Sequence, residues 1–249
     1  MPRAPRFIVP LPGARAPGVA VDLPPAVAHQ ATRVLRLRPG DPIELFDGSG
    51  GAWRATLDRV ATHGSATATL VAFEPPGDAD RARHVTLVIG LLKGEKLEWV
   101  VQKATEVGVA RIAPVVTARS VAVTGRADRW RRIAAEATEQ CGRTIVPVID
   151  DPVPLGESLR LGAADAIRVA CWEDESVVPF RDVVSCSAPD APVVVWVGPE
   201  GGFSRDEASL LTLARATTAS LGPRILRSET AAVVAVALAI EPGLSSTRH

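Results

Sequence analysis

A glycine-rich loop after an apolar run is the segment of the sequence best suited to binding a ligand. Residues 193–197 read Val-Val-Val-Trp-Val, which is typical of a strand buried on both faces. Gly198, Gly201 and Gly202 then let a ligand approach the main chain closely. Ser204, with Glu207 three residues later, has the pattern of a helix capping box. Ligands of open α/β sheets bind just beyond the carboxyl ends of strands, so this loop predicts a ligand site. A tight turn without a ligand is the alternative.

A second segment, residues 219–231, combines a turn with a group of polar side chains. Gly222-Pro223 marks the turn, and the polar residues 227–230 follow it. From Ala231 to Ile240 the chain contains only Ala, Val, Leu and Ile. Ten apolar residues are too few to cross a bilayer, so this run predicts a helix of the core. No other apolar run is long enough, and we therefore expect no membrane partner.

The amino-acid composition and the net charge limit the classes of protein to which this chain can belong. The chain has 249 residues, 47% of them hydrophobic and 22% charged, and a formal net charge of zero. These values are typical of a soluble globular protein and argue against one held on nucleic acid by bulk charge alone. Arginines outnumber acids between residues 119 and 143, which indicates an anion-binding face or merely a solvated one. Three cysteines without CxxC spacing, and no secretory signal, favour reduced thiols and a cytoplasmic location. Scattered histidines give no metal-ligand spacing.

Hydrophobic patterning divides the chain into two domains. Short alternating runs at 43–46, 52–57 and 66–73 predict a small β-barrel domain over residues 1–74. Prolines and a glycine in a polar run mark residues 75–83 as a linker. Alternating strand and helix patterns over 84–249 predict an α/β domain with a parallel sheet flanked by helices. Within the first domain, residues 24–36 predict a helix with His29, Arg33 and Arg36 on one face. That face would bind phosphate or stay solvated.

Several motifs, in order along nearly the whole chain, carry a resemblance to a known family. GPEGGFS at 198–204, LGPRILRSETA at 221–231 and the apolar helix after them resemble the SPOUT class of knotted methyltransferases. The chain is most similar to the ribosomal RNA small subunit methyltransferase E family. Further matches lie at 29–36, 45–48, 93–96, 102–108 and 139–143. The resemblance implies a PUA-like RNA-binding β-barrel, a SPOUT-type domain with a C-terminal trefoil knot, and a homodimer. It also implies methylation of N3 of a uridine in 16S rRNA of the small ribosomal subunit.

The resemblance implies S-adenosylmethionine as the cofactor, bound in a bent shape by the two loops. The GxGxxG signature with its acidic ribose partner is missing, which argues against a dinucleotide. A third strand end, at 170–172, would complete the pocket, with Trp172 either stacking on a base or packed in the core. The predicted cofactor-binding residues are Gly198, Pro199, Glu200, Gly201, Gly202, Leu221, Gly222, Arg224, Ile225, Leu226, Thr230 and Ala231.

Methyl transfer to a uridine nitrogen needs alignment of donor and acceptor and removal of a proton. The site therefore requires a base, or cations that stabilise the uridine anion. Arg119 and Arg227 are the predicted catalytic cations, with Arg224 a further candidate. Glu229 is the predicted base and Glu200 a second candidate. Glu229 could instead cap the following helix and pair with Arg227.

The prediction also includes the residues that contact the RNA substrate. The residues expected to contact it are Arg6, His29, Arg33, Arg36 and Arg143. Two alternatives stay open at this point. One is a 2′-O-ribose methyltransferase of the same knotted class, and the other is a non-catalytic RNA-binding scaffold.

Overall fold

The computed structural model describes residues 4–13, 15–60, 65–120, 126–172, 177–186, 188 and 190–244. These residues form two compact units. The first runs to Arg81 and also takes in Thr138–Val146, and the second contains Ala82–Ala137 and the chain from Pro147 onward. The change from one unit to the other at residue 81 lies inside the predicted linker. The return of residues 138–146 to the first unit is a feature that local patterns in the sequence do not indicate.

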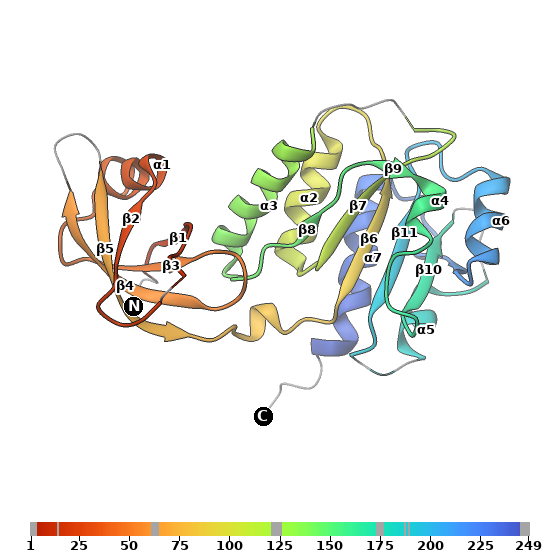
Figure 1. Ribbon diagram of the computed structural model, residues 1–249. Coiled ribbons are helices and arrows are strands. Elements are labelled where there is room, and N and C mark those ends of the chain that lie inside the picture. The colour runs from red at the N-terminus through yellow and green to blue at the C-terminus, as the bar shows by residue number, and fades with distance from the viewer. Residues whose placement is uncertain are drawn as a thin grey trace. The chain divides into compact units, whose positions relative to one another are not determined.

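The first unit is built on a curled five-stranded sheet (Figure 1). Its strands are β1 (Arg6–Ile8), β2 (Ala20–Leu23), β3 (Pro42–Phe46), β4 (Ala52–Val60) and β5 (Ala66–Glu74), in the order β1-β3-β4-β5-β2. All pairs are antiparallel except β1 with β3. Inward-facing residues such as Phe7, Leu45 and Leu57 are fully buried, as the period-two alternation of a strand requires.

The helical segment of this unit is shorter than the sequence predicts. It consists of α1 (Pro25–His29) continued by the π-helical turn η1 (Gln30–Val34). Arg36 lies beyond the helix, in the left-handed region with φ 56°. The prediction that His29, Arg33 and Arg36 share one helical face was therefore wrong for Arg36. A short 3₁₀ turn, η2 (Asp78–Asp80), follows the sheet.

The second unit contains a parallel sheet of seven strands. They are β6 (Val85–Gly90), β7 (Arg111–Val116), β8 (Val148–Ile149), β9 (Val153–Pro154), β10 (Ile167–Cys171), β11 (Val193–Val197) and β12 (Thr217–Ala219). The order is β12-β10-β11-β6-β7-β8, and β9 also pairs with β7. Every pairing is parallel. The central strands β6 and β11 are buried along their whole length, which explains their continuous apolar sequences.

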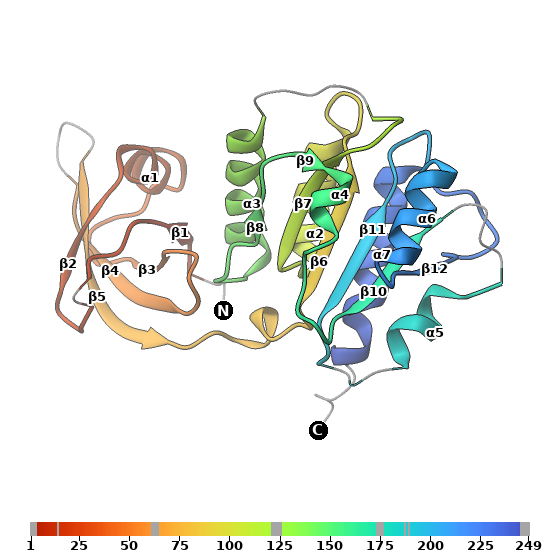
Figure 2. The same cartoon turned by 45° about the vertical axis from the view of Figure 1, so that its right-hand side comes forward.

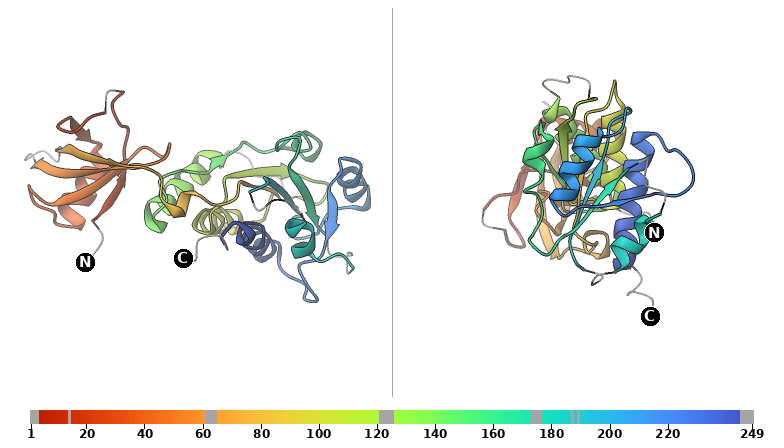
Figure 3. Two further views of the ribbon diagram at one scale, coloured as in Figure 1. Left: turned by 90° about the horizontal axis from the view of Figure 1, so that it is seen from below. Right: turned by 90° about the vertical axis from the view of Figure 1, so that its right-hand side faces the viewer.

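Helices cover both faces of this sheet (Figures 2 and 3). They are α2 (Lys96–Val107), α3 (Ala127–Cys141), α4 (Leu155–Ser158), α5 (Phe180–Ser185), α6 (Arg205–Leu213) and α7 (Ser228–Leu244). The helices α2, α5 and α7 pack together on one face, while α4 and α6 lie on the other. The predicted α/β architecture with a parallel sheet flanked by helices is confirmed. The trefoil knot stays a prediction.

The terminal helix α7 is part of the core. Ala232, Ala235, Val236 and Ala239 are completely buried, and α7 contacts α2, α5, β6 and β11. Small alanine side chains let the helix approach these neighbours closely. Among the described residues, no helix is both long and apolar enough to span a membrane.

Candidate functional site

Three neighbouring strands end side by side at one edge of the parallel sheet. Cys171 at the end of β10 is in register with Val197 of β11 and with Ala219 of β12. The loops after these strands therefore start at the same level, and they line a single cavity of about 980 Å³. This volume is at the upper end for small-molecule sites. The prediction that the two glycine-containing loops converge on one cavity is confirmed.

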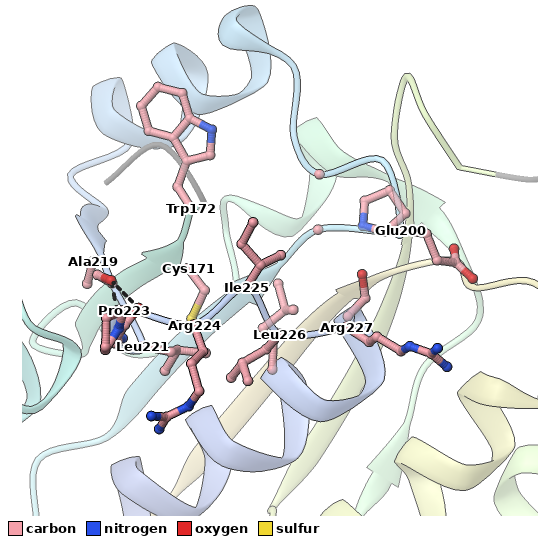
Figure 4. Close-up of a pocket in the computed structure, with 18 of the residues that line it drawn as sticks. Cys171, Trp172, Glu200, Ala219, Leu221, Pro223, Arg224, Ile225, Leu226 and Arg227 are labelled. Atoms are coloured by element: carbon pink, nitrogen blue, oxygen red, sulfur yellow. Dashed lines mark hydrogen bonds between the residues drawn. The ribbon is translucent and has the colours of Figure 1, made fainter. Parts of the chain in front are cut away.

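Most of the predicted cofactor residues line this cavity (Figure 4). They are Gly198, Pro199, Glu200, Gly202, Leu221, Gly222, Arg224, Ile225, Leu226 and Ala231, and the predicted catalytic residue Arg227 lines it as well. Gly201, Thr230, Arg119 and Glu229 are not among the lining residues. Trp172 is half-buried in the cavity wall rather than packed in the core.

Other lining residues were not predicted from the sequence. They are Lys96, Pro179, Val197, Ala219, Ser220, Pro223 and Ser228, whereas Cys171 and Trp172 belong to the strand end at 170–172 that was expected to complete the pocket. Two of these, Lys96 and Pro179, come from segments far from either loop motif. The KGEK segment at 93–96 was recognised as a match to the family but gave no sign that Lys96 faces a ligand site.

The glycine loop is held by close main-chain packing and by the helix after it. A Cβ on Gly90, at the end of β6, would lie 2.6 Å from the ring and nitrogen of Pro199, so only glycine fits there. Gly202 has φ +68°, a conformation that glycine adopts without strain. The Ser204 hydroxyl accepts the Glu207 N–H at 3.2 Å, and the Glu207 carboxylate accepts the Ser204 N–H at 2.8 Å. This is the predicted capping box at the start of α6.

The second loop is tied to a neighbouring segment through Ser220. Its N–H donates to the Val178 carbonyl oxygen at 2.8 Å, and its own carbonyl oxygen accepts the Phe180 N–H at 2.9 Å. The Ser220 hydroxyl also accepts the Gly222 N–H at 3.2 Å. Beyond this anchored turn, Ile225 is 97% exposed. An exposed isoleucine in a cavity wall offers apolar surface that a ligand would bury.

Charged side chains gather at one end of the cavity. Lys96 Nζ lies 2.9 Å from Glu200 Oε1 and 3.9 Å from Glu229 Oε2. Glu200 Oε1 also accepts the Lys93 N–H at 3.2 Å. Figure 4 shows the Glu200 carboxylate and the Arg227 guanidinium on the same side, while Arg224 points to the opposite side. The cavity therefore has a charged end, and apolar side chains such as Leu221 and Leu226 line it elsewhere.

The charges at this end influence one another. Burial acts to raise the pKa of Glu200, but hydrogen bonds from Lys96 and main-chain N–H groups, with the Lys96 charge, lower it overall. The hydrogen bond to Glu200, with the charges of Glu200 and Glu229, raises the pKa of Lys96. Glu200 is thus held as a carboxylate and Lys96 as an ammonium at neutral pH. By contrast, Glu229 Oε2 is a buried atom that has no hydrogen-bond partner in the part of the chain that the structure describes.

The Cys171 thiol lines the cavity in an uncharged form. Burial raises its pKa to about 12, so the thiolate is not formed at neutral pH. Because the thiolate is the nucleophilic form of cysteine, the uncharged thiol is a weak nucleophile toward an electrophilic ligand. Within the described ranges, no group of three or more His, Cys, Asp or Glu residues is placed to hold a metal ion.

The residues predicted to bind RNA fall into two groups. His29, Arg33 and Arg36 are exposed on the first unit. Arg6 and Arg143 are buried, at 8% and 6% exposure. Arg6 pairs with Glu44 at 2.7 Å and donates to the Arg143 carbonyl oxygen at 2.9 Å. Both arginine side chains are therefore placed within the unit rather than on its surface.

Several known proteins are similar to this chain in sequence and in structure. The curated ribosomal RNA small subunit methyltransferases E of Synechocystis sp. and Bacillus subtilis are 34% and 33% identical to this chain. The first match covers 87% of this chain and 71% of the relative, and the second covers 84% of each. The crystal structure of the Neisseria gonorrhoeae methyltransferase E bound to S-adenosyl methionine superposes with a TM-score of 0.84 at 31% identity, covering 94% of this chain and 96% of that one. A Legionella pneumophila methyltransferase in complex with the bound cofactor SAM gives 0.83 at 30% identity, covering 95% and 97%.

Family models match both units. Residues 79–240 match the RNA methyltransferase domain, and residues 23–71 match the RNA methyltransferase PUA domain. The fold and its cavity thus define an RNA methyltransferase with an accompanying PUA domain. At this level of identity and coverage, the chain belongs to the ribosomal RNA small subunit methyltransferase E family. The resemblance found in its sequence motifs is confirmed.

Proposed function

We propose that the protein transfers the methyl group of S-adenosylmethionine to N3 of a uridine in 16S rRNA of the small ribosomal subunit. The observation that carries this proposal is the convergence of three strand-end loops on one cavity. Family membership supports the rRNA substrate, and two relatives of high structural similarity have been solved with the cofactor bound.

The donor would bind against the loops at 198–202 and 219–228. Main-chain N–H and C=O groups there can pair with the adenine edge, and Leu221 and Leu226 supply apolar walls. The uncharged Cys171 thiol suits a site for a sulfonium ion, because a thiolate there would compete for the methyl group.

The acceptor base would enter at the charged end of the cavity. We propose that Glu229 accepts the N3 proton, because its Oε2 has no hydrogen-bond partner among the described residues. Arg227 would stabilise the negative charge of the uridine anion. Glu200 is a poorer base because its pKa is lowered. N3 then attacks the methyl carbon, and the electron pair of the breaking C–S bond stays on sulfur. Arg119 would act by holding the glycine loop.

The first unit would bind the RNA. His29, Arg33 and Arg36 are exposed and can contact phosphate directly. Because Arg6 and Arg143 are buried, they would support this surface through the fold of the unit. We also propose, from the family resemblance, that the protein is a cytoplasmic homodimer. Light scattering of the purified protein tests the dimer.

The direct test uses small ribosomal subunits from a strain lacking the gene, incubated with the purified protein and S-adenosylmethionine. Nucleoside mass spectrometry should detect N3-methyluridine, and reverse transcriptase should stop at one position because N3 methylation blocks base pairing. Detection of 2′-O-methyluridine would instead support a ribose methyltransferase. If calorimetry finds no binding of S-adenosylmethionine, the protein is a scaffold and the proposal is rejected.

A further inference from the structure

Lys96 occupies a position in the cavity that neither loop motif indicates. It is the first residue of α2, and it lines the cavity from the side of β6. The carboxylates next to its ammonium come from two other segments. Glu200 belongs to the glycine loop, and Glu229 lies in the first turn of α7. The ammonium is therefore held where three separate parts of the second unit meet.

This arrangement leaves donor capacity for a ligand. A lysine ammonium has three N–H donors. Among the described residues, the Lys96 ammonium donates a hydrogen bond to Glu200 at 2.9 Å, while its contact with Glu229 at 3.9 Å is an ion pair rather than a hydrogen bond. The Lys96 side chain is 37% exposed. An N–H donor that is not engaged by protein can thus point into the cavity.

Transfer of the N3 proton to Glu229 would leave this end of the cavity with an excess of positive charge next to the acceptor base. Lys96, Glu200 and Arg227 line this end of the cavity, and Glu229 lies behind them with its Oε2 3.9 Å from Lys96 Nζ, so two cations and two carboxylates balance before the reaction. A uracil that loses its N3 proton spreads negative charge onto its two carbonyl oxygens. A cation already fixed by protein groups stabilises such developing charge without reorganisation of solvent.

We propose that Lys96 is a catalytic residue that donates a hydrogen bond to a carbonyl oxygen of the acceptor base as its N3 proton is lost. This inference rests on the proposed function, since it requires an acceptor nitrogen beside a carbonyl group. Lys96 keeps its own proton throughout. The N3 proton goes to the base, the new N–C bond forms from the N3 electron pair, and the cofactor sulfur leaves as a thioether.

The first test compares Lys96→Gln with Lys96→Arg and with Lys103→Gln. Lys103 lies on the same helix, pairs with Glu106 at 2.8 Å and does not line the cavity, so it is a matched control. Single-turnover methylation of small subunits by Lys96→Gln should be slower by about 10²-fold, the usual effect of losing one such donor. Calorimetric affinity for S-adenosylmethionine should be unchanged. Lys96→Arg should keep part of the rate, and Lys103→Gln all of it.

The second test changes the acidity of the acceptor. Small subunits reconstituted with rRNA containing 5-fluorouridine present an N3–H that is more acidic, so less stabilisation of the anion is needed. The defect of Lys96→Gln should shrink on this substrate. An equal defect on both substrates, or a loss of cofactor affinity at unchanged single-turnover rate, would show that Lys96 only shapes the loop. Failure of the proposed function is distinguishable, because the wild-type protein would then form no N3-methyluridine.

Discussion

Arg119 Nη1 donates a hydrogen bond to the carbonyl oxygen of Gly201 at 2.5 Å. The aliphatic part of Arg119 also packs over this glycine, since a Cβ on Gly201 would lie 3.2 Å from it. The neighbouring Ala118 N–H donates to Glu207 Oε1 at 2.7 Å. The loop after β7 is thereby fastened to the glycine loop, and neither Arg119 nor Gly201 is among the residues that line the cavity.

Replacement of Arg119 by alanine should weaken cofactor binding through the loop. Loss of one exposed hydrogen bond costs about 1 kcal/mol, which corresponds to about a fivefold higher dissociation constant. Calorimetry with S-adenosylmethionine measures this change. Arg205→Ala, which removes an exposed arginine at the start of α6, should leave the constant unchanged. If Arg119→Ala abolished turnover without altering affinity, Arg119 would instead act on the reacting groups.

Glu200→Gln should change how stability depends on pH. Hydrogen bonds and the charge of Lys96 lower the pKa of Glu200 below its ordinary value of 4.5. The carboxylate therefore stabilises the folded state above about pH 4.5, and this contribution is lost as pH falls through the lowered value. Urea unfolding between pH 7 and pH 3 should show a wild-type advantage that disappears at the acidic end. A difference between the two proteins that does not vary with pH would contradict this account.

Gly90→Ala should destabilise the second unit. The added methyl group would meet Pro199 at 2.6 Å, and overpacking of this kind costs about 1–3 kcal/mol. Gly156→Ala is the matched control, because it lies in α4 with nothing within 4 Å of the added atom. Helix propensity predicts that this second change is neutral or slightly stabilising. Urea denaturation of both variants measures the difference, and equal stabilities would refute the steric argument.

Asp80→Ala should destabilise the first unit strongly. The Asp80 carboxylate is 1% exposed and accepts hydrogen bonds from the N–H and hydroxyl of Thr144 and from the Ile145 N–H. Its removal leaves these buried donors without an acceptor, at a cost of about 3 kcal/mol. Asp78→Ala removes an aspartate in the same turn that is 83% exposed and should cost little. Hydrogen exchange should report the loss within the first unit, and similar effects of the two substitutions would argue against the role of Asp80.

The sequence was most informative where local patterns determine structure. Continuous apolar residues identified the central strand β11, and Ser204 with Glu207 identified the start of α6, because both features depend on neighbours in the chain. The sequence did not predict the ion pair between Lys96 and Glu200, because the two residues meet only when β6 and β11 lie next to each other in the sheet. The return of residues 138–146 to the first unit depends likewise on the distant Asp80. The catalytic roles, the RNA contacts and the knot stay predictions.

The cavity is completed by residues from 219–231, which come more than a hundred residues after Lys96 in the chain. During synthesis on the ribosome, the strands β6, β7, β10 and β11 are made before the last wall exists. A nascent chain can therefore fold most of this sheet yet bind no S-adenosylmethionine until the loop at 219–228 and the first turn of α7 have emerged from the ribosome. Cofactor capture would then mark the end of folding, and a chain arrested before residue 219 would be inactive even if its earlier parts were native.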